Sequence, residues 1–204
     1  MNYFQAGSPQ QWRDRIKLMA SQGAASWPAL TEEGLQALLT AANLSPKTLK
    51  CKESNRYGVS YRYRIYSDQH SNSERFREIA KQTDDYLFQG LDRAGWEPEY
   101  ASTRFNERTV IKYDPRDLIT PHNDGGSYIG LILILVLVAG GVFYLSADRS
   151  PTSGPVIPAN AGWAILMPAR PTALFPVCQP HGVREVQSRR LTVVFRQRIQ
   201  KPGA

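Results

Sequence analysis

Residues 128–145 read YIGLILILVLVAGGVFYL, an uncharged stretch just long enough to cross a membrane as a helix. Gly140-Gly141 interrupts it, and its β-branched residues favour strands. Its flanks carry Asp124 and Asp148 and lack the one-sided basic cluster that orients membrane helices. The stretch therefore predicts two buried β-strands joined near the Gly-Gly turn, with a membrane-spanning protein as the alternative.

Short apolar runs separated by Gly, Pro and Asn continue on both sides of this stretch, from about Thr109 onward. Runs of this kind at close spacing are typical of a compact β-sandwich or barrel. They are TVIKY (109–113), DLITPH (117–122), WAILMP (163–168), HGVREV (181–186) and RRLTVVFR (189–196). We expect a β-barrel core over residues 107–198.

The N-terminal part of the chain carries three helical patterns. Residues 8–20 offer Ser8 as an N-cap and Pro9 as the first helical residue. Residues 31–42 begin with a threonine cap followed by two acids, and residues 73–94 show apolar residues at helical spacing before a glycine stop. We expect one α+β domain over residues 1–204, in which residues 1–106 form a helical layer with supporting strands.

Residues 56–66, RYGVSYRYRIY, alternate as a half-buried strand does. The alternation places Tyr57, Tyr61, Tyr63 and Ile65 on one face and arginines on the other. We expect the tyrosines to lie in the core and the arginines in water.

Composition sets outer limits on function. With 42% hydrophobic and 21% charged residues, the chain is not a coiled coil, a collagen or a wholly disordered protein. The net charge of +7 is compatible with an anionic ligand or a nucleic-acid partner, and equally with an ordinary basic surface. Cys51 and Cys178 form no CxxC pair, and the first residues do not resemble a signal peptide, so we expect a cytoplasmic protein without a membrane partner.

Three residues in the β-rich part have the types and spacing of a metal site. His122 lies in TPHNDGG with Asp124 two residues later, and positions i and i+2 of a strand point to the same face. His181 begins a later predicted strand. Two imidazoles and one carboxylate on one face of an iron ion leave its other positions open, as in non-haem Fe(II) oxygenases. The H-x-D pair alone is a weak motif, since a histidine near an aspartate is more often part of a turn.

Two further residues strengthen this reading by their spacing. Arg190 follows His181 by nine residues and stands on a predicted strand, where its guanidinium can pair with a dicarboxylate. Tyr113 precedes His122 by the same interval, and its hydroxyl can reach the same ligand.

Residues 113–196 together resemble the catalytic core of the Fe(II)/2-oxoglutarate-dependent oxygenases. The resemblance covers Y-x8-H-x-D, an apolar strand, GGVFYL and H-x8-R-x-T. It implies a double-stranded β-helix, also called a jelly-roll or cupin-like fold. It also implies roles: His122, Asp124 and His181 as iron ligands, Arg190 for the distal carboxylate of 2-oxoglutarate, Tyr113 as a second contact to that co-substrate, and Thr192 in support.

The resemblance further implies a reaction in which 2-oxoglutarate and O₂ are consumed, succinate and CO₂ are released, and a C–H bond is hydroxylated. Related halogenases have a small residue in place of the carboxylate ligand, so Asp124 favours hydroxylation. Demethylation and desaturation stay open, as do the substrate, the stereochemistry and the oligomeric state.

Three substrate classes fit the resemblance. We rank a small metabolite such as a free amino acid first, and a peptide second, because prolyl hydroxylases share the Tyr-to-His spacing and the proline before the histidine. An alkylated base comes third: Arg190 and Arg196 are spaced like the paired arginines of AlkB-like demethylases, and the strand over 56–66 can offer phosphate contacts and stacking. A non-catalytic cupin-like binding module is the non-enzyme alternative.

Other polar and aromatic residues receive ordinary readings. We expect Arg196 to point outward at its strand end, His70 to lie in a solvated loop, and Trp163 to be a core or rim aromatic. Arg104 and Arg116 are treated as surface residues.

Overall fold

The computed structural model describes residues 2–44, 48–56, 58–67, 74–96, 104–150 and 152–199. The expectations for Tyr57 and His70 fall outside these ranges.

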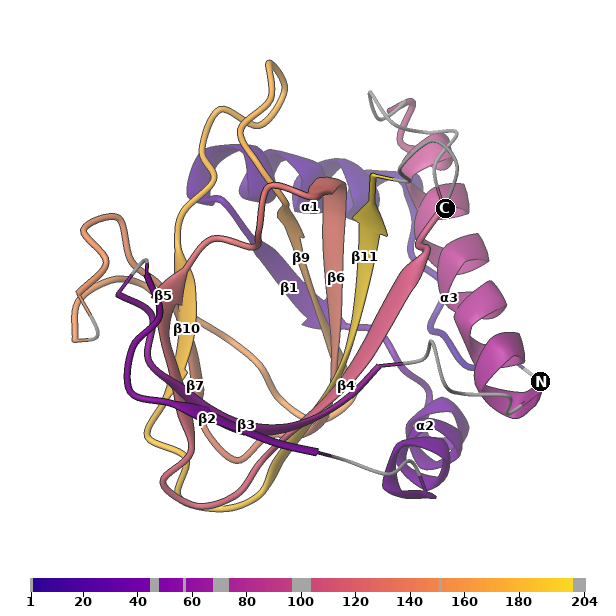
Figure 1. Ribbon diagram of the computed structural model, residues 1–204. Helices are drawn as coiled ribbons and strands as arrows, with labels where there is room; N and C mark the ends of the chain where they lie inside the picture. The colour runs from indigo at the N-terminus through magenta and orange to yellow at the C-terminus, as the bar shows by residue number, and fades with distance from the viewer. Residues whose placement is uncertain are drawn as a thin grey trace.

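The described strands form one antiparallel sheet that curls into a nearly closed barrel (Figure 1). Their spatial order is β1-β9-β6-β11-β4-β3-β5-β10-β7-β8, with β2 paired to β3. Strands β3, β4 and β5 make the closure, because β3 pairs with β4 through its second half and with β5 through its first. The strands are β1 (Ala25–Pro28), β2 (Thr48–Lys52), β3 (Tyr61–Ser67), β4 (Glu107–Tyr113), β5 (Leu118–His122), β6 (Tyr128–Val138), β7 (Val142–Leu145), β8 (Val156–Ile157), β9 (Trp163–Pro168), β10 (His181–Arg184) and β11 (Arg190–Arg198).

Strand β6 explains the long uncharged run. Its odd-numbered residues, such as Leu133 and Leu135, pack in the core beneath the helices, while Ile132 and Ile134 face the barrel interior. A strand buried on both faces reads as a continuous apolar run rather than as an alternation. The prediction of two strands joined at Gly140-Gly141 is confirmed, and the membrane-helix alternative for residues 128–145 is wrong. No helix among the described residues has the length and apolar character needed to cross a membrane.

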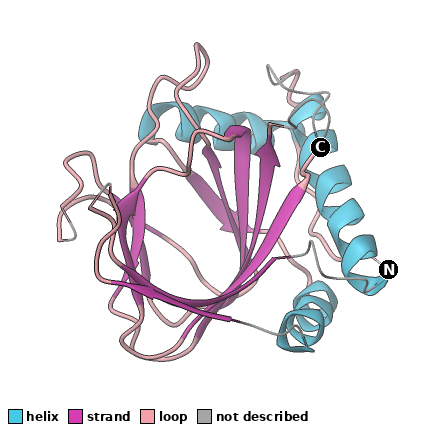
Figure 2. Ribbon diagram, in the orientation of Figure 1, coloured by secondary structure: helices cyan, strands magenta, loops and turns pink. Residues whose placement is uncertain are grey.

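Three helices cover the outer face of the barrel (Figure 2). They are α1 (Pro9–Gln22), α2 (Glu32–Leu44) and α3 (Glu74–Arg93). Each end lies within two residues of the bound predicted from the sequence. Helix α1 begins with a capping box in which the Ser8 hydroxyl accepts from the Gln11 N–H and the Gln11 side chain accepts from the Ser8 N–H. The Thr31 hydroxyl accepts from the Gly34 N–H at 3.0 Å and caps α2. The expected α+β architecture, a β-barrel core with a helical layer, is therefore confirmed.

Three short strands have no counterpart among the predicted elements. Strands β1 and β8 are too short for an alternation to register, and all five residues of β2 are exposed, so it carries no apolar signal. Strand β2 lies outside the main path of the sheet as the partner of β3.

Candidate active site

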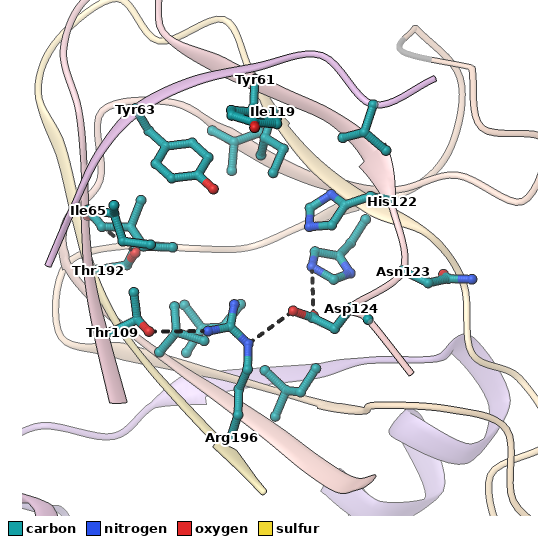
Figure 3. A pocket seen from close by; sticks show the side chains of 18 of the residues that line it. Tyr61, Tyr63, Ile65, Thr109, Ile119, His122, Asn123, Asp124, Thr192 and Arg196 are labelled. Carbon is teal, nitrogen blue, oxygen red and sulfur yellow. Dashed lines mark hydrogen bonds and ion pairs between the residues drawn. The ribbon is translucent and has the colours of Figure 1, made fainter. Parts of the chain in front are cut away.

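A cavity of about 610 Å³ opens between the two walls of the barrel. Its lining includes every residue for which the sequence predicted a site role, namely Tyr113, His122, Asp124, His181, Arg190 and Thr192. Trp163, Arg104 and Arg116 do not line it. Figure 3 shows His122 of β5, Asp124 of the loop that follows it and Thr192 of β11 directed into this cavity.

The two histidines are direct neighbours across adjacent strands. His122 ends β5, His181 begins β10, and the two are register partners. Their ring centroids lie 4.6 Å apart. One ligand atom from each histidine and one from Asp124 all lie within 4.8 Å of one another. Asp124 itself stands two residues beyond the end of β5, so the expectation that it shares a strand with His122 is wrong, although the turn brings it to the same place.

Neighbouring groups fix the orientation of both imidazoles. His122 Nδ1 lies 3.0 Å from the Thr120 carbonyl oxygen, which only accepts, so a neutral His122 carries its proton there and leaves Nε2 for a metal. The Phe143 ring stacks on His181 at a centroid distance of 5.6 Å. Burial lowers the pKa of His122, and burial followed by repulsion from His122 lowers the pKa of His181 to about 3. Both rings are neutral near pH 7, the state in which imidazole binds a metal.

The low pKa of His181 predicts acid sensitivity of the metal-free protein. Between about pH 6.5 and about pH 3 the unfolded chain binds a proton at this residue and the native protein does not. The free energy of unfolding should therefore fall as the pH drops through this window. Above the window the stabilising contribution of the neutral His181 ring is fully present. Urea unfolding at a series of pH values measures the slope, and His181→Asn should flatten it. An equal slope in the variant would place the acid sensitivity elsewhere.

The two oxygens of Asp124 have different surroundings. Oδ1 accepts from Arg196 Nε at 3.0 Å. Oδ2 lies 3.5 Å from His181 Nε2 and receives no hydrogen bond from the described residues. Burial raises the pKa of Asp124, but charge interactions, of which the one with the Arg196 guanidinium is the largest, hold the pKa below its ordinary value. A buried, ionised oxygen without a donor, beside two neutral imidazoles, fits a divalent cation.

Arg196 overturns one expectation. Its side chain does not point outward but lies in the cavity wall, only 13% exposed, between Asp124 and Thr109 (Figure 3). It also lies 3.7 Å from Glu107 Oε1 and over the Tyr128 ring. The signal was present in the sequence, because Arg190 and Arg196 are an even number of positions apart on one strand and so share its inner face.

The Arg196–Asp124 pair predicts a metal-dependent stability defect. Arg196→Met should lower the free energy of unfolding of the metal-free protein by about 3 kcal/mol, because it leaves a buried carboxylate without its cation. Mn(II) should restore part of the loss by supplying the missing positive charge. Thermal unfolding with and without Mn(II) measures both effects. Arg198→Met is the matched control: Arg198 also contacts Glu107, at 3.4 Å, but is half-exposed, so its loss should cost under about 1 kcal/mol. Equal effects of the two changes would contradict the pairing.

Arg190 is a buried cation with an incomplete set of partners. Its side chain is 1% exposed, Nη1 donates to the Gly141 carbonyl at 3.3 Å, and Nε and Nη2 have no hydrogen-bond partner among the described residues. Burial lowers its pKa to about 10, so the group keeps its charge at neutral pH. Its register partner is Tyr113, whose pKa burial raises, so that the hydroxyl remains a donor. Such a cation in a cavity wall fits a carboxylate ligand.

The strand predicted over 56–66 also contributes to the site. Tyr61, Tyr63 and Ile65 share a face as predicted, but they line the cavity instead of a closed core (Figure 3). On the opposite face Arg62 pairs with Asp117 at 3.0 Å and Arg64 with Asp114 at 3.2 Å. The arginines and tyrosines of this strand therefore lie on opposite faces and cannot both contact one bound nucleic acid.

Comparison with known proteins establishes the fold. No protein-family model and no curated protein matches the sequence. Among solved structures, a 2OG-Fe(II) oxygenase family oxidoreductase from Burkholderia pseudomallei aligns with a TM-score of 0.67 and 14% identity, over 95% of this chain and 92% of that one. A Pseudomonas putida prolyl-4-hydroxylase aligns with a TM-score of 0.63 and 13% identity, over 92% of this chain and 99% of that one. HygX from Streptomyces hygroscopicus, solved with nickel and 2-oxoglutarate, aligns with a TM-score of 0.60 and 14% identity, over 91% of this chain and 86% of that one. The chain has the fold of the 2OG-Fe(II) oxygenases.

Proposed function

We propose that this protein is an Fe(II)- and 2-oxoglutarate-dependent oxygenase that hydroxylates a C–H bond of a small metabolite, such as a free amino acid, with release of succinate and CO₂. One observation carries the proposal. The cluster of His122, Asp124 and His181 shares its cavity with the unpaired guanidinium of Arg190. A metal site alone fits many functions. A metal site beside a buried guanidinium with unused hydrogen-bond donors fits a dicarboxylate co-substrate that chelates the metal.

Each residue has a defined part in this proposal. His122 and His181 bind iron through neutral imidazole nitrogens, and Asp124 binds it through the oxygen that Arg196 leaves free. Arg190 holds the distal carboxylate of 2-oxoglutarate, the Tyr113 hydroxyl donates to the co-substrate, and Thr192 contributes to the same wall. When bound, the iron supplies open coordination positions at which the co-substrate and O₂ react.

The chain itself orients and shields the reactants. Thr120 and Phe143 hold the two imidazoles, and Arg196 holds the carboxylate, so the ligand atoms are in place before metal arrives. Apolar side chains of β6, β7 and β11 line the cavity and exclude water from it, among them Ile132, Ile134, Phe143 and Val194.

The size of the cavity favours a small substrate. A volume of about 610 Å³ lies within the range of small-molecule sites, and 2-oxoglutarate occupies part of it. A peptide is the second candidate, since a prolyl-4-hydroxylase shares the fold. An alkylated nucleic-acid base is less favoured as substrate, because Arg62 and Arg64, expected to contact phosphates, are paired with aspartates on the outer face.

Anaerobic titration of the metal-free protein with Fe(II) and 2-oxoglutarate tests the proposal. We expect a weak visible charge-transfer band that needs both components and is lost in Arg190→Ala. Succinate release is then measured with free amino acids and with proline-rich peptides. A folded protein that gives no band would overturn the proposal in favour of a cupin-like binding module.

A further inference from the structure

The loop between β7 and β8 is organised around one carboxylate. Asp148 Oδ1 accepts from the Ser146 hydroxyl, the Ser150 N–H and the Ser153 hydroxyl, each at 2.9 Å. Arg149 sits within this network with a φ of 60°, in the left-handed region that few residues other than glycine adopt. Hydrogen bonds, rather than burial, therefore hold the backbone that presents Arg149.

Arg149 is a cavity-lining cation that has no ion-pair partner among the described residues. It is exposed and lines the cavity, so it stands at the opening. Within the described part of the chain it forms no ion pair, since its neighbour Asp148 is engaged by the hydroxyl and amide donors of the loop. The other two arginines of the cavity already have roles, because Arg196 pairs with Asp124 and Arg190 faces the proposed co-substrate.

Strand β2 adds positive charge on the cavity side of the sheet. Lys50 and Lys52 are the register partners of Tyr63 and Tyr61, and partners across an antiparallel pair share a face. Because both tyrosines face the cavity (Figure 3), both lysines stand on the cavity side of the sheet, one strand further out. Positive groups around an opening draw anions toward it.

We infer that Arg149 binds a carboxylate group of the substrate at the mouth of the cavity, so that the metabolite oxidised is a small organic acid. This inference rests on the proposed function and names its substrate class. A guanidinium pairs with a carboxylate through two parallel hydrogen bonds, which fixes the orientation of the acid as well as its position. The hydrogen bonds of Asp148 to Ser146 and Ser150 hold the backbone on both sides of Arg149, so it can do so without a large loss of backbone freedom.

The test measures ligand binding to wild type, Arg149→Ala and Arg116→Ala, each loaded anaerobically with Fe(II) and 2-oxoglutarate. The probes are the free amino acids, simple aliphatic and aromatic monocarboxylic acids, and the carboxamide of each, and the signal is the change they cause in the visible band. Arg116 is the matched control, because it also has a left-handed φ of 73° but does not line the cavity.

We expect at least one acid to bind wild type and Arg116→Ala, with its carboxamide at least about tenfold weaker. Arg149→Ala should bind the acid about tenfold to a hundredfold more weakly and treat acid and carboxamide alike, while its 2-oxoglutarate band stays unchanged. The inference is overturned if Arg149→Ala binds the acid as wild type does, if carboxamides bind as tightly as acids, or if no probe binds while the band forms. It is equally overturned if only a proline-rich peptide or an oligonucleotide perturbs the band. Absence of the band in wild type is a separate result, which removes the proposed function itself.

Discussion

His122→Ala should abolish succinate release while the barrel stays folded. The variant lacks one of the three residues that place a ligand atom in the cluster, and loss of even an outer partner of a metal ligand weakens binding by about 10- to 100-fold. We therefore expect metal affinity to fall by at least about a hundredfold. The structural cost is small, because the hydrogen bonds of this ring join it to backbone groups of Thr120 and His181, which water in the cavity can replace. Their loss should lower the free energy of unfolding by about 1–2 kcal/mol.

Comparing Asp124→Ala with His122→Ala distinguishes the effect of the site on metal binding from its effect on stability. Asp124→Ala should also abolish metal binding, but it leaves Arg196, whose side chain is only 13% exposed, with the more distant Glu107 as its counter-charge among the described residues. Breaking one half of a buried pair costs about 3 kcal/mol, so this metal-free variant should be clearly less stable than His122→Ala. Mn(II) binding by calorimetry and urea unfolding of the metal-free proteins measure the two effects. Metal binding near the wild-type affinity in His122→Ala would show that the cluster is not the metal site.

Local patterns in the sequence predicted the candidate site residues, because each motif that carries them spans only a few consecutive residues. The H-x-D spacing, the apolar run of β6 and the strand that carries Arg190 and Thr192 each sit within a few residues. The meeting of His122 with His181 depends instead on the pairing of β5 with β10, which no local pattern specifies. That pairing was reached through the resemblance of the whole motif order to a known fold, and the structure places the two rings 4.6 Å apart.

The misplaced residues share one physical cause. Arg196 and the tyrosines of β3 were assigned by the general preference of charged groups for water and aromatic groups for the core. A barrel with an internal cavity offers a third environment, in which a buried arginine is stable beside a carboxylate and a tyrosine can face empty space. Whether a strand face meets a packed core or a cavity depends on the opposite wall of the barrel. For Arg196 the decisive partner was Asp124, which lies on a different element.

Arg190→Met should make the metal-free protein more stable and remove its affinity for 2-oxoglutarate. Wild type buries a charged guanidinium whose Nε and Nη2 have no partner among the described residues, and only the Gly141 carbonyl accepts from it. An apolar side chain of similar volume avoids that desolvation, so the free energy of unfolding should rise by about 1–3 kcal/mol. Without the cation, the KM for 2-oxoglutarate should rise by more than about a hundredfold.

Urea unfolding and 2-oxoglutarate titration of Arg190→Met and Arg196→Met test this pair of expectations. The two arginines share one face of β11, and Arg190 is buried while the Arg196 side chain is only 13% exposed, yet the substitutions should change stability in opposite directions. Arg196 has a carboxylate partner in the metal-free protein, whereas Arg190 would gain one only when the co-substrate binds. A loss of stability in Arg190→Met would mean that its guanidinium supports the fold, and unchanged 2-oxoglutarate affinity would remove its proposed role. Opposite signs are expected because Arg196 already has its carboxylate partner in the metal-free protein, whereas the partner proposed for Arg190 is a carboxylate of the co-substrate.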